Sequence, residues 1–337
     1  MELPDTETTN GPPSTRLRSS AANAADSIRS IADVPFRLRA ADRARREVLD
    51  AYTSAWDSPV DSVDERAREP SRFEYSAEPL ARPDRPPDAT GPGLAAWHAG
   101  GHLLIHDDSG CSAVADEGGL TIHGPALLRG VERTAGTALG YVLQGHTLLT
   151  LHAAALLLPG GGAVLATGPT GAGKSTLAAI ALQEGWPVLA DDLCVIDTRV
   201  EPRITGVPRA PAVPADVAPV LVDAVTDEPD LRGRRCLPAS FLTRGWHPLV
   251  ALLRIEHGNT PHSTLSPRSA RTLVDDVLFG QMSAVSPAHF RAALLQCTVL
   301  AGLPGFTLAH GTDATIRVAS GVDRLRELER SVPATRS

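Results

Sequence analysis

The stretch that most constrains the fold is AVLATGPTGAGKSTLAAIALQEG, residues 163–185, where an apolar run meets a glycine-rich turn and then a helical pattern. Residues 168–175 match the pattern G-x-x-x-x-G-K-S/T, which requires a strand before it and a helix after it. Glycines let successive backbone N–H groups turn inward, and the N-terminus of the following helix favours a bound anion. We therefore predict an α/β fold in which this turn holds the phosphates of a nucleotide.

Lys174 is the only lysine among the 32 basic residues of the chain, and all the others are arginine. A lysine ammonium is a compact charge on a thin stem, whereas the guanidinium of arginine is planar and wide. We expect Lys174 to reach between the β- and γ-phosphates of ATP and the Ser175 hydroxyl to bind Mg²⁺, so ATP and Mg²⁺ are the predicted cofactors. The predicted nucleotide contacts are Gly168, Pro169, Thr170, Gly171, Ala172, Gly173, Lys174, Ser175 and Thr176.

Two adjacent aspartates follow the helix, within the segment WPVLADDLCVID at residues 186–197, which is predicted to be one buried strand. Asp191 comes 17 residues after Lys174, enough for a helix and a turn to return the chain beside the phosphates. We predict that Asp191 is the catalytic base and that Asp192 holds the metal together with Ser175. Because adjacent strand residues face opposite ways, these roles can be exchanged; the alternative is one metal-anchoring aspartate beside a strand-end cap.

A histidine, His152, begins the apolar run LHAAALLL, and by position alone it could be structural. The segment at residues 151–197, however, resembles the core of the HPr kinase/phosphorylase family. It shares a Leu-His start, an alternating strand, the G-x-S/T-G-x-G-K-S-T turn, a helix ending in glycine, and an Ala-Asp-Asp triplet. The resemblance implies that His152, Asp191 and Asp192 flank the transferred phosphoryl group, with an aspartate as the base on a serine hydroxyl.

The same resemblance implies a P-loop kinase core of the HPr-kinase type, a mixed sheet with flanking helices, after a small β-rich N-terminal region. It is closest to the HPr-kinase-like proteins encoded with ribosomally made peptides, including lasso-peptide precursor kinases. The E-V-R-G-L-G signature of HPr kinases themselves is replaced by EPRITGVPRAPA at residues 201–212, which favours this peptide- or small-molecule-directed branch.

The predicted activity is ATP-dependent transfer of the γ-phosphate to a hydroxyl, with a serine of a lasso-type precursor peptide as the acceptor. One alternative is a kinase for a small hydroxylated metabolite. Another is a nucleotide-hydrolysing switch or ATPase, although a guanine-specific N-K-x-D motif is impossible with one lysine. A third is a module that binds a nucleotide without chemistry, against which the intact Lys-Ser and Asp-Asp pairs argue.

Composition divides the chain into three parts. Residues 1–65 are polar, and we expect a mobile or partly helical segment with one amphipathic helix at 39–56. Residues 66–146 should form a small α+β region, and residues 147–337 the P-loop kinase domain. Further predicted elements are hairpins at 94–124, a helix at 125–146, a strand at 248–257 and a helix at 323–332.

Composition also bears on partners and location. The formal net charge of −7 argues against nucleic acid bound on a broad basic surface. No run approaches the roughly 20 apolar residues of a membrane helix, and the N-terminus lacks a signal-peptide pattern. The 4 cysteines lie far apart, which favours reduced thiols in a cytoplasmic protein. The sequence leaves open whether the protein forms a homo-oligomer. The arginine cluster of Arg232, Arg234 and Arg235 could contact phosphates or an acidic substrate; the alternative is a solvated loop.

Overall fold

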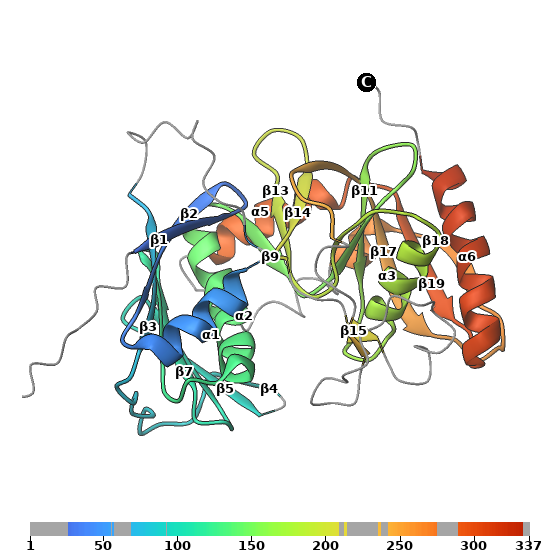
Figure 1. The fold of residues 1–337 in the computed structure, drawn as a ribbon. Coiled ribbons are helices and arrows are strands. Elements are labelled where there is room, and N and C mark those ends of the chain that lie inside the picture. Colours follow the sequence, from blue (N-terminus) through green and yellow to red (C-terminus); the bar gives the residue numbers. More distant parts are fainter. Residues whose placement is uncertain are drawn as a thin grey trace, which may run out of the picture.

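The computed structural model describes residues 26–54, 56, 69–91, 93–208, 212–213, 235–236, 242–274 and 289–332. Two large β-sheets lie side by side, each with helices packed against it (Figure 1). Both contain parallel and antiparallel strand pairs, so the fold is mixed α/β, as expected. No helix within the described ranges is both long enough and apolar enough to cross a membrane.

The first sheet has eight strands in the order β1-β2-β3-β8-β7-β6-β5-β4. β2, β3 and β8 are parallel neighbours, and the remaining pairs are antiparallel. The hairpins predicted between residues 94 and 124 are present as β5 to β8. The strands are β1 Ser27–Ile31, β2 Val34–Ala40, β3 Ser71–Ser76, β4 Ala89–Gly91, β5 Leu94–Ala99, β6 His102–Asp107, β7 Ser112–Asp116 and β8 Gly119–His123.

β1 and β2 come from the segment predicted to be mobile or partly helical, and this prediction is corrected for the residues that form them. The two strands form a hairpin through Ala32 and Asp33, which have positive φ values of 52° and 63°. Phe36 and Leu38 of β2 are fully buried in the core of the first sheet, and Arg37 between them faces outward. This burial of alternate side chains fixes β2 in the sheet although the strand also carries the arginines Arg37 and Arg39.

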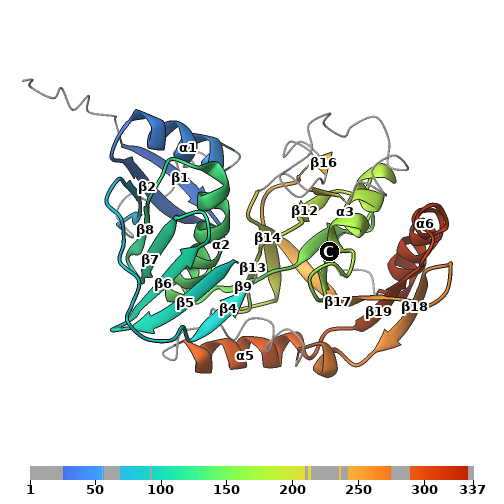
Figure 2. The same ribbon diagram turned by 90° about the horizontal axis from the view of Figure 1, so that it is seen from below.

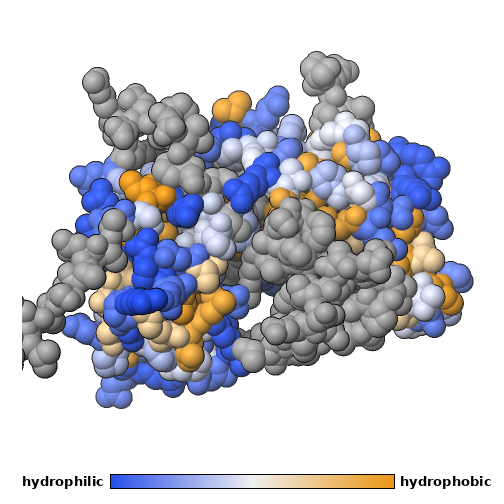
Figure 3. Space-filling model, in the orientation of Figure 1, coloured by the Kyte–Doolittle hydropathy of each residue, from blue (hydrophilic) through white to orange (hydrophobic). Residues whose placement is uncertain are grey.

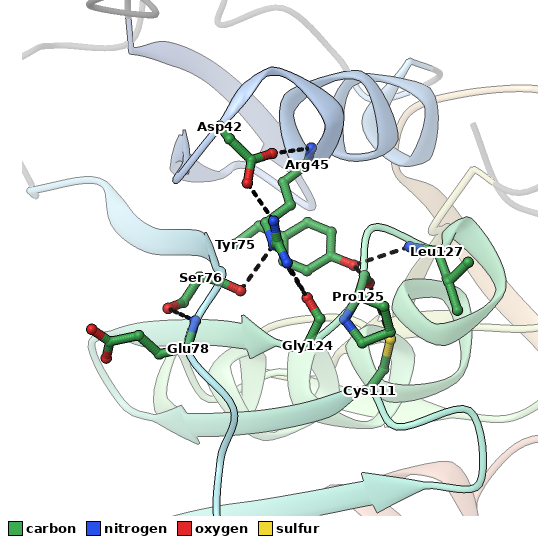
Figure 4. Close-up of polar contacts among 9 residues, drawn as sticks. All are labelled: Asp42, Arg45, Tyr75, Ser76, Glu78, Cys111, Gly124, Pro125 and Leu127. Atoms are coloured by element: carbon green, nitrogen blue, oxygen red, sulfur yellow. Dashed lines mark hydrogen bonds and ion pairs between the residues drawn. The ribbon is translucent and has the colours of Figure 1, made fainter. Parts of the chain in front are cut away.

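Two helices cover the inner face of the first sheet: α1 at Arg43–Thr53, within the range predicted, and α2 at Leu128–Gly145. The carboxylate of Asp42 caps α1 by accepting a hydrogen bond from the backbone N–H of Arg45 at 2.9 Å. The Arg45 side chain then crosses to the chain around Gly124, just before α2 (Figure 4). This junction ties the first helix to the entry of the second.

The second sheet has nine strands, seven of them in the order β12-β10-β11-β17-β14-β13-β9, while β19 pairs with both β17 and β18. β11, β17 and β19 are parallel neighbours, so their carboxyl ends lie at one edge. A separate antiparallel pair joins β15 and β16. The strands are β9 Leu149–Leu151, β10 Ala154–Leu157, β11 Ala163–Thr167, β12 Val188–Ala190, β13 Cys194–Asp197, β14 Arg203–Gly206, β15 Ala212–Val213, β16 Arg235–Cys236, β17 His247–His257, β18 Thr264–Arg268 and β19 Gly305–His310.

Helices cover both faces of the second sheet. α3 at Lys174–Gln183 and α6 at Ala314–Ser331 pack on one face, and α5 at Phe290–Leu300 packs on the other. Figure 2 shows α5 extending beneath the region where the two sheets meet. α6 begins well before the helix predicted at 323–332, because the Asp313 carboxylate accepts from the Ile316 N–H at 2.8 Å and caps it there.

One hydrophobic cluster includes residues of both halves. Leu148, Val195 and Val207 of the second half are buried together with the residues of the first sheet, and Leu193 packs against the same cluster. The outer surface is different: on the face shown in Figure 3, hydrophobic residues are scattered among hydrophilic ones. Leu193, the residue directly after Asp192, thus packs against the core of the N-terminal half.

Candidate functional site

The glycine turn (residues 168–173) connects β11 directly to α3, in the predicted order of strand, turn and helix. Gly168, Gly171 and Gly173 have φ values of 154°, 85° and 105°, which residues with a side chain rarely adopt. The Ala172 N–H also donates to the carbonyl oxygen of Pro169 at 3.1 Å. These positions therefore need glycine for the chain to curl back on itself ahead of the helix.

The glycine turn lies against the carboxyl ends of two parallel strands, β17 and β19. A Cβ on Gly168 would lie 2.4 Å from the carbonyl oxygen of Ile255 in β17. A Cβ on Gly173 would lie 2.4 Å from Cδ2 of His310 at the end of β19. Ligands of open α/β sheets bind at this kind of edge, and the N-terminus of α3 adds unpaired N–H groups that favour an anion.

Lys174 is the first residue of α3 and is buried, with 6% of its surface exposed. Its Nζ donates hydrogen bonds to the carbonyl oxygens of Gly168 at 2.8 Å and Pro169 at 3.2 Å. Burial lowers the pKa of the ammonium, while the charges of Asp191 and Asp192 act in the opposite direction. The single lysine is thus folded back onto the glycine turn, within electrostatic reach of the aspartate pair.

The segment predicted as one strand at residues 186–197 is two strands, and the aspartate pair forms the break between them. β12 before the break pairs with β10, whereas β13 after it pairs with β9 and β14. The chain changes strand partners at this point, so Asp191 and Asp192 cannot belong to one continuous ladder. Asp191 is buried at 8% exposure, and the side chain of Asp192 is 36% exposed.

His152 lies at a matching break, between β9 and β10, and contacts Asp192. Its Nδ1 is 2.9 Å from Oδ1 of Asp192 and 3.0 Å from the carbonyl oxygen of the same residue. The backbone N–H of Ala153 donates to that carbonyl oxygen at 3.2 Å. The two breaks are therefore joined, and the half-exposed imidazole of His152 lies where it can reach a ligand from solvent.

The two carboxylates differ in their surroundings. Of the two, Asp191 has the larger electrostatic effect on the pKa of Lys174, whose ammonium bonds the glycine turn. Asp192 is the partner of His152 and is the more exposed. The thiol of Cys194, two residues on, is fully buried, and burial together with both aspartates raises its pKa well above the ordinary value. Cys194 is thus an inert neighbour and not a nucleophile.

Ser175 and Thr176, two of the other predicted nucleotide contacts, differ in how exposed they are. Ser175 is half-buried in the first turn of α3, as a hydroxyl that binds a cation beside the turn would be. Thr176 is buried at 3% exposure, so its side chain belongs to the protein interior and the predicted contact is reduced to its backbone. The predicted cluster of Arg232, Arg234 and Arg235 lies outside the residues whose side chains the structure describes.

Sequence reasoning missed His310. It ends the strand GFTLAH, and nothing in the strand pattern distinguishes it from a structural histidine. The structure brings its Nε2 to within 3.2 Å of the carbonyl oxygen of Gly173, across 137 residues of chain. Only the pairing of β19 with β17, beside β11, reveals this contact.

The fold and site together define a mixed α/β protein with a glycine turn, a buried lysine and a histidine–aspartate pair at one sheet edge. No protein-family model matches the chain, and no curated protein matches it. Among solved structures, one similar chain is the Hpr(Ser) kinase/phosphatase from Coxiella burnetii, with 12% identity and a TM-score of 0.28, covering 54% of this chain and 97% of that one. So low a score gives no residue correspondence, and the site rests on this chain's own geometry.

Proposed function

We propose that this protein is an ATP- and Mg²⁺-dependent kinase that transfers the γ-phosphoryl group to a hydroxyl. The observation that carries the proposal is the convergence at one sheet edge of a glycine turn, the buried ammonium of Lys174, and an aspartate pair of which Asp192 contacts His152. A turn alone would bind an anion, but the additional carboxylate–imidazole pair offers a base next to the bound phosphates.

Nucleotide binding would use the glycine turn and the start of α3. Backbone N–H groups of Gly168 and of residues 170–174 would surround the β- and γ-phosphates. The ammonium of Lys174 would leave the carbonyl oxygens of Gly168 and Pro169 and bond instead to phosphate oxygens. Because its present bonds are to neutral carbonyls, phosphate oxygens would be stronger acceptors for the charged donor.

The residues present fit a magnesium ion held by few protein ligands. Among the described residues no cluster of three or more His, Cys, Asp or Glu side chains could hold a metal. Mg²⁺ usually keeps waters and takes one or two protein ligands together with substrate phosphates, so the Ser175 hydroxyl and one aspartate suffice. When bound, the ion would neutralise the charge of the phosphates and hold them in line with the acceptor.

We propose exchanging the roles predicted for the two aspartates. Asp192 would be the base, because its carboxylate is exposed and contacts the imidazole of His152 at 2.9 Å. Asp191 would act on the metal side, because it is buried and has the stronger effect on Lys174. His152 would orient the Asp192 carboxylate through Nδ1–H, and its half-exposed ring would face phosphoryl oxygens or the acceptor.

In the proposed reaction, the acceptor hydroxyl oxygen forms a bond to the γ-phosphorus while the bond from that phosphorus to the β,γ-bridging oxygen breaks. The hydroxyl proton passes to the Asp192 carboxylate, and ADP leaves with the bonding electron pair. Lys174 and the N–H groups of the glycine turn stabilise the charge that develops on the phosphate oxygens. Products are ADP and a phosphate monoester.

The proposed acceptor is a serine of a precursor peptide of the lasso type. The resemblance of residues 151–197 supports a peptide acceptor, and the exposure of His152 and Asp192 supports approach of a long chain from solvent. A small hydroxylated metabolite is the second candidate. Cytoplasmic location follows from the need for ATP and remains part of the proposal.

The test compares Asp192→Asn with Asp191→Asn, measuring phosphate on the acceptor by mass spectrometry and ATP affinity by calorimetry. Asp192→Asn should lower kcat by about 10²–10⁴-fold, with the ATP affinity changed little, since it removes the base alone. Asp191→Asn should weaken the Mg²⁺ dependence of ATP binding. The opposite pattern would restore the roles predicted from sequence.

ATP consumption with and without acceptor distinguishes a kinase from an ATPase. Loss of ATP that depends on a hydroxyl acceptor supports the proposal. Hydrolysis at the same rate without any acceptor would favour the nucleotide-hydrolysing switch instead.

A further inference from the structure

His310 is a buried histidine outside the proposed set of reacting residues. It is 2% exposed at the end of β19, and its Nε2 lies 3.2 Å from the carbonyl oxygen of Gly173. Gly173 is the N-cap of α3 and the last residue of the glycine turn. The imidazole therefore touches the point at which the turn becomes a helix.

The chemistry of this contact fixes the tautomer of His310. A carbonyl oxygen can only accept, so Nε2 carries the hydrogen and donates it to Gly173. Burial lowers the pKa of His310 to about 4, against the opposing effect of the Gly173 contact, so the ring is neutral near pH 7. Within the described residues nothing donates to or accepts from Nδ1, so the hydrogen bond of the ring is the one to the glycine turn.

Steric contacts hold the ring and the turn together. A Cβ on Gly173 would lie 2.4 Å from Cδ2 and 2.7 Å from Nε2 of His310, so the ring lies directly on the glycine backbone. The backbone of His310 is fixed in turn by the Gly258 N–H, which donates to its carbonyl oxygen at 2.8 Å. The imidazole is thus a rigid contact between β19 and the glycine turn.

The carbonyl of Gly173 and the N–H of Lys174 belong to one peptide unit. A trans peptide is planar, and its C=O and N–H point in opposite directions. The Gly173 oxygen accepts from the Leu177 N–H at 2.9 Å within α3 and from His310 at 3.2 Å. Two donors on this oxygen therefore fix the direction of the Lys174 N–H, which would bond the phosphates.

We propose that His310 is a positioning residue that aims the Lys174 backbone N–H at the phosphates by donating Nε2–H to the Gly173 carbonyl. The inference rests on the proposed nucleotide site, but no role for His310 follows from that proposal itself. Because the N–H would bond the phosphates both before and during transfer, losing its alignment should raise KM for ATP and leave kcat nearly unchanged.

The experiment compares His310→Phe, which keeps a planar ring without the donor, with His310→Gln, whose amide restores an N–H donor. A control is His257→Phe at the exposed β17 residue paired with His310. His310→Phe should raise the Kd for ATP about five- to tenfold, the loss of one hydrogen bond. His310→Gln should recover most of that loss, and His257→Phe should match the wild type.

Hydrogen exchange of the nucleotide-free proteins gives a readout that needs no ligand. In His310→Phe, amide exchange at residues 171–177 should accelerate, while exchange in the middle of α6 stays unchanged. Equal exchange at residues 171–177 in all variants would overturn the inference. So would a His310→Phe protein that melts at a lower temperature yet binds ATP as tightly as the wild type, since that outcome marks a purely structural ring.

A wild-type protein that binds no ATP would refute the proposed function. In that case the exchange experiment still decides whether His310 orders the glycine turn. The two failures are therefore distinguishable.

Discussion

Each half of the molecule has a cation bonded to backbone carbonyl oxygens, half-buried Arg45 in the first and buried Lys174 in the second, and the two are held in different ways. In the N-terminal half the Arg45 guanidinium bonds Asp42 and the carbonyl oxygens of Ser76 and Gly124, and it lies 5.6 Å from the centre of the Tyr75 ring (Figure 4). In the second half the Lys174 ammonium bonds two carbonyl oxygens of the glycine turn.

The difference lies in what the bonds connect. Arg45 reaches carbonyls 31 and 79 residues away, so its bonds join α1 to β3 and to the entry of α2. Lys174 reaches carbonyls only 6 and 5 residues away, so its bonds connect groups that already lie close together in the glycine turn. Bonds of the first kind stabilise the fold, whereas bonds of the second kind can be exchanged for a ligand without loosening it.

The phenol of Tyr75 completes the N-terminal junction. Its hydroxyl donates to the carbonyl oxygen of Pro125 and accepts from the Leu127 N–H at 3.3 Å, at the start of α2. Burial raises the pKa of Tyr75 to about 12, so the hydroxyl stays protonated over the ordinary pH range. Because these groups satisfy each other, the junction contributes stability and leaves no reactive group directed at a ligand.

The largest effect expected from this comparison is on activity. Lys174→Ala should lower turnover by about a thousandfold or more, because it removes charge stabilisation at the transferred phosphoryl group. Its free energy of unfolding should change by less than that of Arg45→Ala, since the hydrogen bonds lost are to carbonyls of the same turn and join no separate elements. Rate assays and thermal unfolding on the same samples provide the measurement.

Lys174→Arg sharpens the same test. The arginine keeps the charge, but its guanidinium is wider than the ammonium it replaces, so turnover should also fail. An arginine variant with full activity would show that charge alone is required at this position.

The next effect is on stability without activity. Arg45→Ala should lower the free energy of unfolding by about 2–3 kcal/mol, because charged hydrogen bonds joining three elements are lost. Its kcat/KM should be that of the wild type. A matched control in the same helix is Arg43→Ala, whose 93% exposed side chain pairs only with Glu47 at the surface and should change stability by less than about 0.5 kcal/mol.

Denaturant unfolding and kinetics of both arginine variants decide this prediction. Equal stabilities for Arg45→Ala and Arg43→Ala would mean that the junction does not hold the N-terminal half together. A large drop in the kcat/KM of Arg45→Ala at unchanged stability would contradict the division between the two halves.

The smallest effect concerns acid. The pKa of His310 falls from 6.5 to about 4 on folding, so the unfolded chain binds a proton there that the folded chain does not. Between these values stability therefore falls as the pH falls, by about 2 kcal/mol from pH 7 to pH 5. The neighbouring charges of Arg317 and His257 act in the same direction, and they oppose protonation of the folded ring.

Urea unfolding at pH 7 and pH 5 measures this slope. In His310→Phe the unfolding free energy should lose about 2 kcal/mol less over the same interval. An unchanged slope in that variant would show that the acid sensitivity resides in other groups.

Much of the fold could be predicted from local patterns. The glycine turn between a strand and a helix, the hairpins of β5 to β8, and the helices α1 and α2 follow from turn residues and periodicity, which depend on neighbours in the chain. β1 and β2 were missed, although Phe36 and Leu38 alternate with arginines, because the surrounding segment is polar enough to hide that pattern.

The site was predictable only in part. Residue types and spacing pointed to Lys174, the aspartates and, through resemblance, His152. The break at Asp191 and Asp192 was not foreseen, because it results from strand partners far away in sequence. His310 was missed for the same reason, since its contact with the glycine turn depends on the order of strands in the sheet and not on any local signal.

Leu193, which follows Asp192 directly and packs against the core of the N-terminal half, has a practical consequence. The second half cannot be transplanted by itself, because cutting the chain near residue 147 would remove the residues that Leu148, Leu193 and Val195 pack against. The segment that carries Asp191 and Asp192 would then lose the core that supports it on one side. A hybrid protein that joins the second half to a new recognition region must therefore keep the first sheet as well.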